Sequence, residues 1–194
     1  MKIILASKSP RRKAILNRLN HPFEIIDPNL DESILSTSII PTEYCKILAK
    51  FKAQKVGKQY PEALTIGSDT IVVIKNNILN KPKDKLDAQK MLKMLCGHTH
   101  LVITGVCLYF KQKNISYCFS ETTKVTFRKI NRQEILHYIK YFKPYDKSGA
   151  YGIQDWSAIF VKKIDGCYDN VVGFPLSRFY YELKKNGINL LDSF

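Results

Sequence analysis

The chain opens on Lys2-Ile3-Ile4-Leu5-Ala6, passes through Ser7-Lys8-Ser9-Pro10-Arg11-Arg12 and continues as Lys13-Ala14-Ile15-Leu16-Asn17-Arg18-Leu19. The apolar first run predicts a buried strand, the polar second run a turn, and the third run a helix. Ser9 is a favoured helix N-cap. Pro10 suits the first helical position, because the backbone N–H of that position has no acceptor within the helix and proline therefore loses no hydrogen bond there. This stretch therefore predicts a strand, a turn and a helix at the start of an α/β protein.

Two arginines occupy the first turn of the helix that is predicted to start at Pro10. The N–H groups and the dipole of a helix N-terminus favour anions, so Arg11 and Arg12 stand where cations are locally unfavourable. A local rule broken at a strand–helix turn is typical of a functional site, and an anionic ligand such as a polyphosphate would remedy it. The plainer alternative is two solvated arginines on a surface helix.

Strand-like and helix-like runs alternate along the rest of the chain. Further strands are expected at 23–26, 63–66, 71–74, 101–110, 116–127 and 159–164, and helices at 41–57, 87–95, 134–139 and 176–185. This alternation predicts an α/β (mixed α+β) fold. A length of 194 residues, without a repeat or a linker-like segment, predicts a single domain over 1–194.

The chain is strongly basic, with a formal net charge of +14. The excess is evenly spread, since residues 1–97 hold 17 basic and 9 acidic side chains and residues 98–194 hold 14 and 8. A nucleic-acid binder would be expected to gather its basic residues on one stripe or patch, so this distribution does not favour nucleic acid as a partner. An evenly basic surface does suit the attraction of a small polyanionic substrate.

The cysteines and the hydropathy of the sequence indicate where in the cell the protein is located. Five cysteines lie far apart with no Cys-x-x-Cys pair, which predicts reduced thiols rather than a disulfide framework. No apolar stretch is long enough to span a bilayer, and the opening residues lack the pattern of a signal peptide. The sequence therefore predicts a cytoplasmic protein without a membrane partner.

A polar tetrad, Gly67-Ser68-Asp69-Thr70, separates two runs rich in β-branched residues. An aspartate within a buried strand is costly unless it is paired or bound to a metal. A bulge at Gly67 would interrupt the strand and turn the Asp69 carboxylate into a cleft, which favours a functional role. The alternative is an aspartate in a hairpin turn that accepts backbone N–H groups.

Three further segments carry less specific signals. Lys52 and the Lys81-Pro82 pair could meet phosphates, although most lysines of so lysine-rich a chain are solvated. Asp31-Glu32 lies in a polar loop and adds little without further support. Cys96-Gly97-His98-Thr99-His100 matches no zinc spacing, and a helix end followed by a strand explains it more simply.

The last unusual segment runs from Asp146 to Gln154 and holds Gly149 and Gly152 beside small residues. Glycines let the backbone approach a ligand closely, and Gln154 offers both a donor and an acceptor to the edge of a base. A structured loop without a ligand is the alternative. The sequence contains neither a Walker A motif nor a dinucleotide-binding Gly-x-Gly-x-x-Gly, so bound phosphates would need another arrangement.

Together these segments resemble the Maf family of nucleoside triphosphate pyrophosphatases in order and spacing over nearly the whole chain. The matching segments are Leu5-Ala6-Ser7-x-Ser9-Pro10-Arg11-Arg12, Asp31-Glu32, Lys52-Ala53, Gly67-Ser68-Asp69-Thr70, Lys81-Pro82, Gly97-His98-Thr99-His100-x-Val102-x-Thr104-Gly105-Val106, the segment from Asp146 to Gln154, and Val171-Val172-Gly173-Phe174-Pro175-Leu176. Tyr151-Gly152-Ile153-Gln154 resembles the branch acting on dTTP and UTP rather than the branch acting on methylated GTP. Lys8 and Ser148 stand where the family often has smaller residues.

The resemblance implies a fold and a reaction. The fold would be an elongated domain with a central mixed sheet and a cleft between two lobes. The reaction would be hydrolysis of dTTP and UTP, or of modified pyrimidine nucleotides, to the nucleoside monophosphate and diphosphate. Water would attack the α-phosphorus with the help of a divalent metal, Mg²⁺ or Mn²⁺. A homodimer and a separate role in cell division are also compatible with the family.

The resemblance also implies roles for individual residues. Asp69 would be the proton acceptor, with Lys52 and Lys81 completing the catalytic set. Substrate binding would fall to Ser7, Arg11, Arg12, Thr70 and Gln154, and metal binding to Glu32 and Asp69. The chemistry agrees, because arginine suits bidentate phosphate contacts and lysine supplies a compact positive charge.

Overall fold

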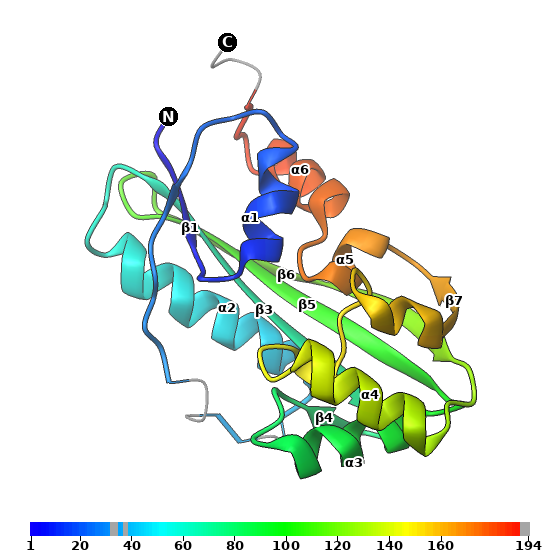
Figure 1. Ribbon diagram of the computed structural model, residues 1–194. Coiled ribbons are helices and arrows are strands. Elements are labelled where there is room, and N and C mark those ends of the chain that lie inside the picture. The colour runs from blue at the N-terminus through cyan, green and yellow to red at the C-terminus, as the bar shows by residue number, and fades with distance from the viewer. Residues whose placement is uncertain (32–34, 37–38, 191–194) are drawn as a thin grey trace. The chain divides into compact units, whose positions relative to one another are not determined.

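The computed structural model describes residues 1–31, 35–36 and 39–190 (Figure 1). The chain divides into two compact units, each assembled from segments that are distant in sequence. Unit 1 comprises Met1–Asp69, Thr104–Glu121 and Gly173–Phe194, and unit 2 comprises Thr70–Ile103 and Thr122–Val172. The single domain over 1–194 stays a prediction.

Seven strands of the described chain form one mixed sheet in the order β2-β1-β3-β5-β6-β7, with β4 paired to β3. The strands are β1 (Ile3–Ala6), β2 (Glu24–Ile25), β3 (Leu64–Ile74), β4 (Asn77–Leu79), β5 (Thr99–Phe110), β6 (Ile115–Phe127) and β7 (Val161–Asp165). β1 is parallel to both β2 and β3, whereas the β3–β4 and β6–β7 pairs are antiparallel. The expected α/β class with a central mixed sheet is confirmed, while the elongated outline and the cleft stay predictions.

The opening stretch folds as its sequence predicts. β1 is buried at all of its positions and is followed by a short turn into α1 (Pro10–Asn17). The Ser9 hydroxyl accepts a hydrogen bond from the backbone N–H of Arg12 at 3.4 Å, and Pro10 fills the first helical position. The sequence signals for the N-cap and for the first turn are therefore confirmed.

In unit 1, helix α2 (Pro41–Gly57) packs on one face of β3, and α1 and α6 (Leu176–Lys185) pack on the other. A Cβ added at Gly67 would collide with the carbonyl oxygen of Ala49 in α2, so only glycine permits so close an approach. Ile66, the preceding residue, lines an apolar cavity together with Leu16 of α1 and Phe179 of α6. Successive side chains of a strand alternate between its faces, so Asp69 shares the α2 face with Gly67.

In unit 2, helices α3 (Lys85–Leu95) and α4 (Arg132–Phe142) pack against each other. Asn131 closes a capping box with Glu134 at the start of α4. The remaining elements are the 3₁₀ helices η2 (Ser148–Ala150) and η3 (Trp156–Phe160) and the short helix α5 (Tyr168–Val172), which the sequence analysis missed. The unit's core gathers side chains from α3, α4, η3 and the strands, among them Val125, Phe127, Tyr138 and Phe160.

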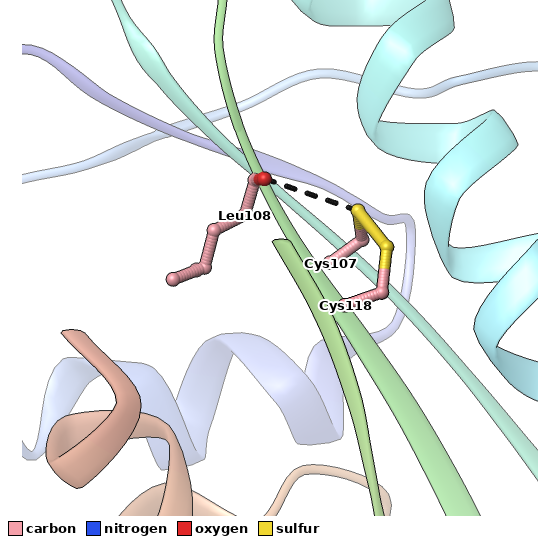
Figure 2. The surroundings of a disulfide bond; sticks show 3 residues. All are labelled: Cys107, Leu108 and Cys118. Atoms are coloured by element: carbon pink, nitrogen blue, oxygen red, sulfur yellow. Dashed lines mark hydrogen bonds between the residues drawn. A yellow bond between two sulfur atoms is a disulfide. The ribbon is translucent and has the colours of Figure 1, made fainter. Parts of the chain in front are cut away.

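Cys107 of β5 and Cys118 of β6 form a disulfide, so the expectation that all the thiols are reduced is wrong for this pair (Figure 2). Residues 111–114 join the two neighbouring strands, which makes them an antiparallel hairpin and places distant cysteines opposite each other. Figure 2 shows both cysteine side chains on the side of the strands opposite to that of Leu108. Cys107 packs there against Ala49 and Ala53 of α2.

A second expectation, that Gly67-Ser68-Asp69-Thr70 interrupts the strand, is also wrong. β3 runs unbroken from Leu64 to Ile74, and its parallel register with β1 is regular through the pair Ala6 and Gly67. Gly67 serves the close approach of α2 instead of a bulge. The Asp69 carboxylate is therefore presented by a regular strand beneath a helix.

Candidate active site

Arg12 of α1 is hydrogen-bonded both to the turn before its own helix and to a distant segment of unit 1. Its Nη1 donates a hydrogen bond to the Ser7 hydroxyl at 3.2 Å, and its Nε donates to the backbone carbonyl of Gly173 at 3.0 Å. Ser7 follows the last residue of β1, and its hydroxyl also accepts from the backbone N–H of Ser9. These contacts hold a guanidinium group at the carboxyl end of a parallel strand, where open α/β sheets bind ligands.

A buried ion pair joins α2 to β3 in the same unit. The Lys52 ammonium lies 2.6 Å from Oδ1 of Asp69, and the two side chains are only 6% and 8% exposed. Burying a charge away from water is costly unless the charge is paired. Removing either partner would therefore leave the other as an unpaired buried charge. The register of β1 with β3 pairs Ala6 with Gly67, so Ser7 and Asp69 both come just after that pair.

Lys52 is buried because of its place on the helix. The buried positions of α2 follow a helical spacing that includes Leu48, Ala49, Lys52, Ala53 and Val56. A lysine on the apolar stripe of an amphipathic helix is the signal that distinguishes Lys52 from the many solvated lysines of this chain. Without the family resemblance, the residues around Lys52 predict a function for it only weakly.

Cys45, in the same helix, is a protonated thiol. Burial, and after it the negative charge of Asp69, raise the pKa of Cys45 to about 12. Its sulfur donates a hydrogen bond to the backbone carbonyl of Thr42 at 3.3 Å. A thiol in this state is neither a nucleophile nor a metal ligand at neutral pH, so the reactive chemistry near Asp69 is carboxylate and ammonium chemistry.

Two of the sequence-predicted residues lie in unit 2 close to the middle of the chain. Thr70 follows Asp69 in β3, and its backbone carbonyl accepts a hydrogen bond from the Ser148 hydroxyl at 2.7 Å. Lys81 is exposed just after β4 and next to Asn80, whose carbonyl accepts from the backbone N–H of Gly149 at 3.2 Å. Segment 148–149 is thus joined both to β3 and to the residue before Lys81.

Gln154 stands exposed at the tip of a tight turn. The backbone N–H of Asp155 donates to the carbonyl of Gly152 at 2.9 Å, which closes a four-residue turn with Ile153 and Gln154 at its centre. Ile153 is buried, so the turn is anchored on one side and presents Gln154 on the other.

The predicted site residues therefore fall into three groups. Unit 1 brings together Ser7 and Arg12 in one contact and Lys52 and Asp69 in another, with Arg11 half-buried in the first turn of α1. Unit 2 holds Thr70, Lys81 and Gln154. Glu32, the expected second metal ligand, lies outside the described residues. Sequence reasoning missed the Gly173 carbonyl, because a backbone acceptor leaves no signal in side-chain chemistry.

The fold and these side chains define an α/β protein with a mixed sheet, an arginine at the carboxyl end of β1 and a buried Lys–Asp pair beneath α2. The chain belongs to the Maf family, since the model of that family, described as Maf-like protein, matches residues 2–186. A dTTP/UTP pyrophosphatase of Carboxydothermus hydrogenoformans is 44% identical over 187 residues, covering 96% of this chain and all of the relative. A protein of the same name from Geobacillus sp. is 46% identical over 95% of this chain and 98% of the relative.

Among solved structures, a nucleoside-triphosphatase / dITP/XTP pyrophosphatase from Mycobacterium abscessus aligns with 67% of this chain and 76% of its own. Its TM-score is 0.41 at 17% sequence identity.

Proposed function

We propose that this chain hydrolyses dTTP and UTP to the nucleoside monophosphate and diphosphate. The observation that carries the proposal is the match at 44% identity, over the full length of the relative, to a curated dTTP/UTP pyrophosphatase. The buried Lys52–Asp69 pair supports it, because it supplies an ionised carboxylate that can accept a proton from water.

In the proposed reaction, water attacks the α-phosphorus. The new bond joins the water oxygen to that phosphorus, and the bond from the α-phosphorus to the oxygen bridging the α- and β-phosphates breaks. Asp69 orients the water and takes its proton, while the Lys52 ammonium holds the Asp69 carboxylate in place. Diphosphate leaves with the electron pair of the broken bond. Proton transfer to a positioned base typically contributes about 10²–10⁴ to the rate of such a step.

The phosphates would be held by Arg11, Arg12, Ser7 and Lys81. Arg12 is prepared for this task because the Gly173 carbonyl and the Ser7 hydroxyl already fix the orientation of its guanidinium. A preoriented donor loses little conformational entropy on binding, and removing one such contact from a reaction centre typically costs about 10²–10³ in rate. The same bound phosphates would offset the unfavourable placement of two arginines at a helix N-terminus.

A divalent ion, Mg²⁺ or Mn²⁺, would be held at this site by carboxylates together with the substrate phosphates. No group of three His, Cys, Asp or Glu side chains gathers within the described part of the chain. Mg²⁺ is commonly held by only one or two carboxylates together with substrate phosphates, and Asp69 with Glu32 would supply such a pair. When bound, the ion would neutralise phosphate charge and polarise the α-phosphoryl group.

Selection of the base would fall to Gln154, with Arg11 and Thr70 contributing. Uracil and thymine present an N3–H donor beside an O4 acceptor, and the glutamine amide can meet both with its carbonyl oxygen and NH₂ group. Cytosine presents the reverse pattern, so a fixed amide would leave polar groups without hydrogen bonds. Such a mismatch costs about 1–3 kcal/mol, which corresponds to a discrimination of roughly tenfold to a hundredfold.

Gln154→Ala tests the base-selecting role. We expect the ratio of kcat/KM for UTP to that for CTP to fall towards one, while the products stay the same. The assay measures UTP, dTTP, CTP and GTP with the parent and the variant. An unchanged UTP-to-CTP ratio would remove Gln154 from base recognition.

The activity itself is tested by incubating the purified protein with a panel of nucleoside triphosphates and Mg²⁺ or Mn²⁺. We expect diphosphate release with UTP and dTTP and little with purine nucleotides. Repeating the panel with chelator measures the dependence on metal. Release of orthophosphate and a nucleoside diphosphate instead would contradict the proposal.

The compartment and the assembly belong to the same proposal. Within the described residues, no helix is both long and apolar enough to cross a membrane. We place the protein in the cytoplasm. A homodimer stays a prediction, and light scattering coupled to size-exclusion chromatography measures it.

A further inference from the structure

The turn that presents Gln154 is held at both ends by one side chain from a different element. Tyr138 of α4 is fully buried. Its hydroxyl accepts a hydrogen bond from the backbone N–H of Gly152 at 3.3 Å and donates one to Oδ2 of Asp155 at 3.0 Å. Gly152 and Asp155 are the first and last residues of the turn, so a single hydroxyl bridges its two ends.

Other contacts close the same turn more tightly. The Ser157 hydroxyl donates to the carbonyl of Gly152 at 2.8 Å and accepts from its N–H at 3.2 Å. Oδ1 of Asp155 accepts from the backbone N–H of Ser157 at 2.9 Å.

The Tyr138 hydroxyl is able to keep this role at any working pH. Burial raises the pKa of Tyr138 above its ordinary value, so the phenol stays protonated and remains a donor to Asp155. The ring is locked as well, because it lies within the core of unit 2 and stacks with Phe142 at 5.4 Å between ring centroids. A buried phenol on a helix is a more rigid support than a loop side chain.

We infer that Tyr138 is a positioning residue for base selection, because its hydroxyl fixes the turn that holds Gln154 in a single orientation. The inference rests on the proposed function, in which Gln154 reads the base. Discrimination against cytosine requires that the amide keep one orientation relative to the base, since a free amide would flip to suit either pattern. Tyr138 itself touches no substrate in this account.

The test is Tyr138→Phe, which removes the hydroxyl and keeps the ring in the core. Loss of one or two hydrogen bonds predicts a fall of about threefold to tenfold in the UTP-to-CTP ratio of kcat/KM. The Gly152 amide should exchange its hydrogen faster in the variant, a readout that does not depend on activity. Tyr117→Phe is the matched control, since it removes a phenol that donates to Glu182 at 2.8 Å in unit 1. The control should change neither quantity.

The outcomes separate the inference from the proposed function. If Gln154→Ala lowers the UTP-to-CTP ratio and Tyr138→Phe leaves it unchanged, the positioning role is overturned and base reading by Gln154 stands. If Gln154→Ala itself has no effect, base reading fails and the inference fails with it. Should Tyr138→Phe not fold, Asp155→Ala removes the carboxylate to which the Tyr138 hydroxyl donates, and an unchanged ratio in that variant overturns the inference.

Discussion

At the scale of single residues, the account depends on the Lys52–Asp69 pair. Its two charges are almost completely removed from water, with their nitrogen and oxygen atoms 2.6 Å apart. Such a pair adds little net stability, yet removing either partner is costly because the other charge stays buried. A pair that contributes so little to folding requires another reason for its presence, and the proton transfer proposed for Asp69 would supply one.

Asp69→Asn should lower kcat by about 10²–10⁴, the usual contribution of a general base. It should also lower the free energy of unfolding by up to about 3–5 kcal/mol, because Lys52 loses its counter-charge in a buried position. The double variant Lys52→Met and Asp69→Asn removes both charges, so stability should recover in part while activity does not. Denaturant titration and steady-state kinetics on the parent and on the two variants measure this. Recovery of activity in the double variant would show that the pair is only structural.

At the scale of elements, the sequence predicts most of the helices and strands. It does not predict the contacts that helices and strands make with one another. The helix over Pro41–Gly57 and the start of α1 follow from local signals that act within one turn of chain. The unbroken course of β3 does not, because a Gly-Ser-Asp run disfavours a strand locally. The packing of α2 over Gly67 overrides that preference, and only the folded chain contains that contact.

In the candidate site too, the sequence identifies residues but not the long-range contacts that they make. The family resemblance implies roles for Ser7, Arg12, Lys52 and Asp69. In unit 1, Ser7 and Arg12 are hydrogen-bonded to each other, and Lys52 and Asp69 form an ion pair. The Cys107–Cys118 disulfide and the Tyr138 bridge depend on hairpin register and on helix placement, which residue spacing does not reveal. Long-range backbone contacts, such as that of Arg12 with Gly173, are equally invisible in the sequence.

Gly67→Ala tests the packing of α2 on β3. The added methyl group would overlap the Ala49 carbonyl, so the helix must shift away from the strand. We expect a loss of at least about 1–3 kcal/mol in the free energy of unfolding, as for other overpacked cores. Activity should fall too, since Lys52 moves with the helix while Asp69 stays on the strand. Ser116→Ala, at an exposed position of β6, is the control. Parent-like stability of Gly67→Ala would contradict the packing described for α2.

At the scale of the whole molecule, the dominant property is the net charge of +14. The described lysines are spread through both halves of the sequence, so the field they create is long-ranged and not tied to one contact. A nucleoside triphosphate, which carries several negative charges, would be attracted from all sides. Charge of this kind is expected to affect encounter and binding rather than the chemical step.

The kinetics with UTP should therefore depend on ionic strength. Raising the salt concentration from about 20 mM to about 200 mM shortens the screening length severalfold. We expect kcat/KM to fall by about threefold or more while kcat changes little, with the metal concentration held constant. Equal effects on kcat and on kcat/KM would instead point to an effect of salt on the catalytic groups.

The central claim is that water attacks the α-phosphorus of dTTP or UTP, and the most direct measurement is hydrolysis of UTP in water enriched in ¹⁸O. The products are separated and the position of the label is read by mass spectrometry or by ³¹P NMR. The account predicts one ¹⁸O atom in the uridine monophosphate and none in the diphosphate. Label in the diphosphate would place the attack at the β-phosphorus and contradict the role given to Asp69, and labelled orthophosphate beside uridine diphosphate would contradict the proposed reaction as a whole.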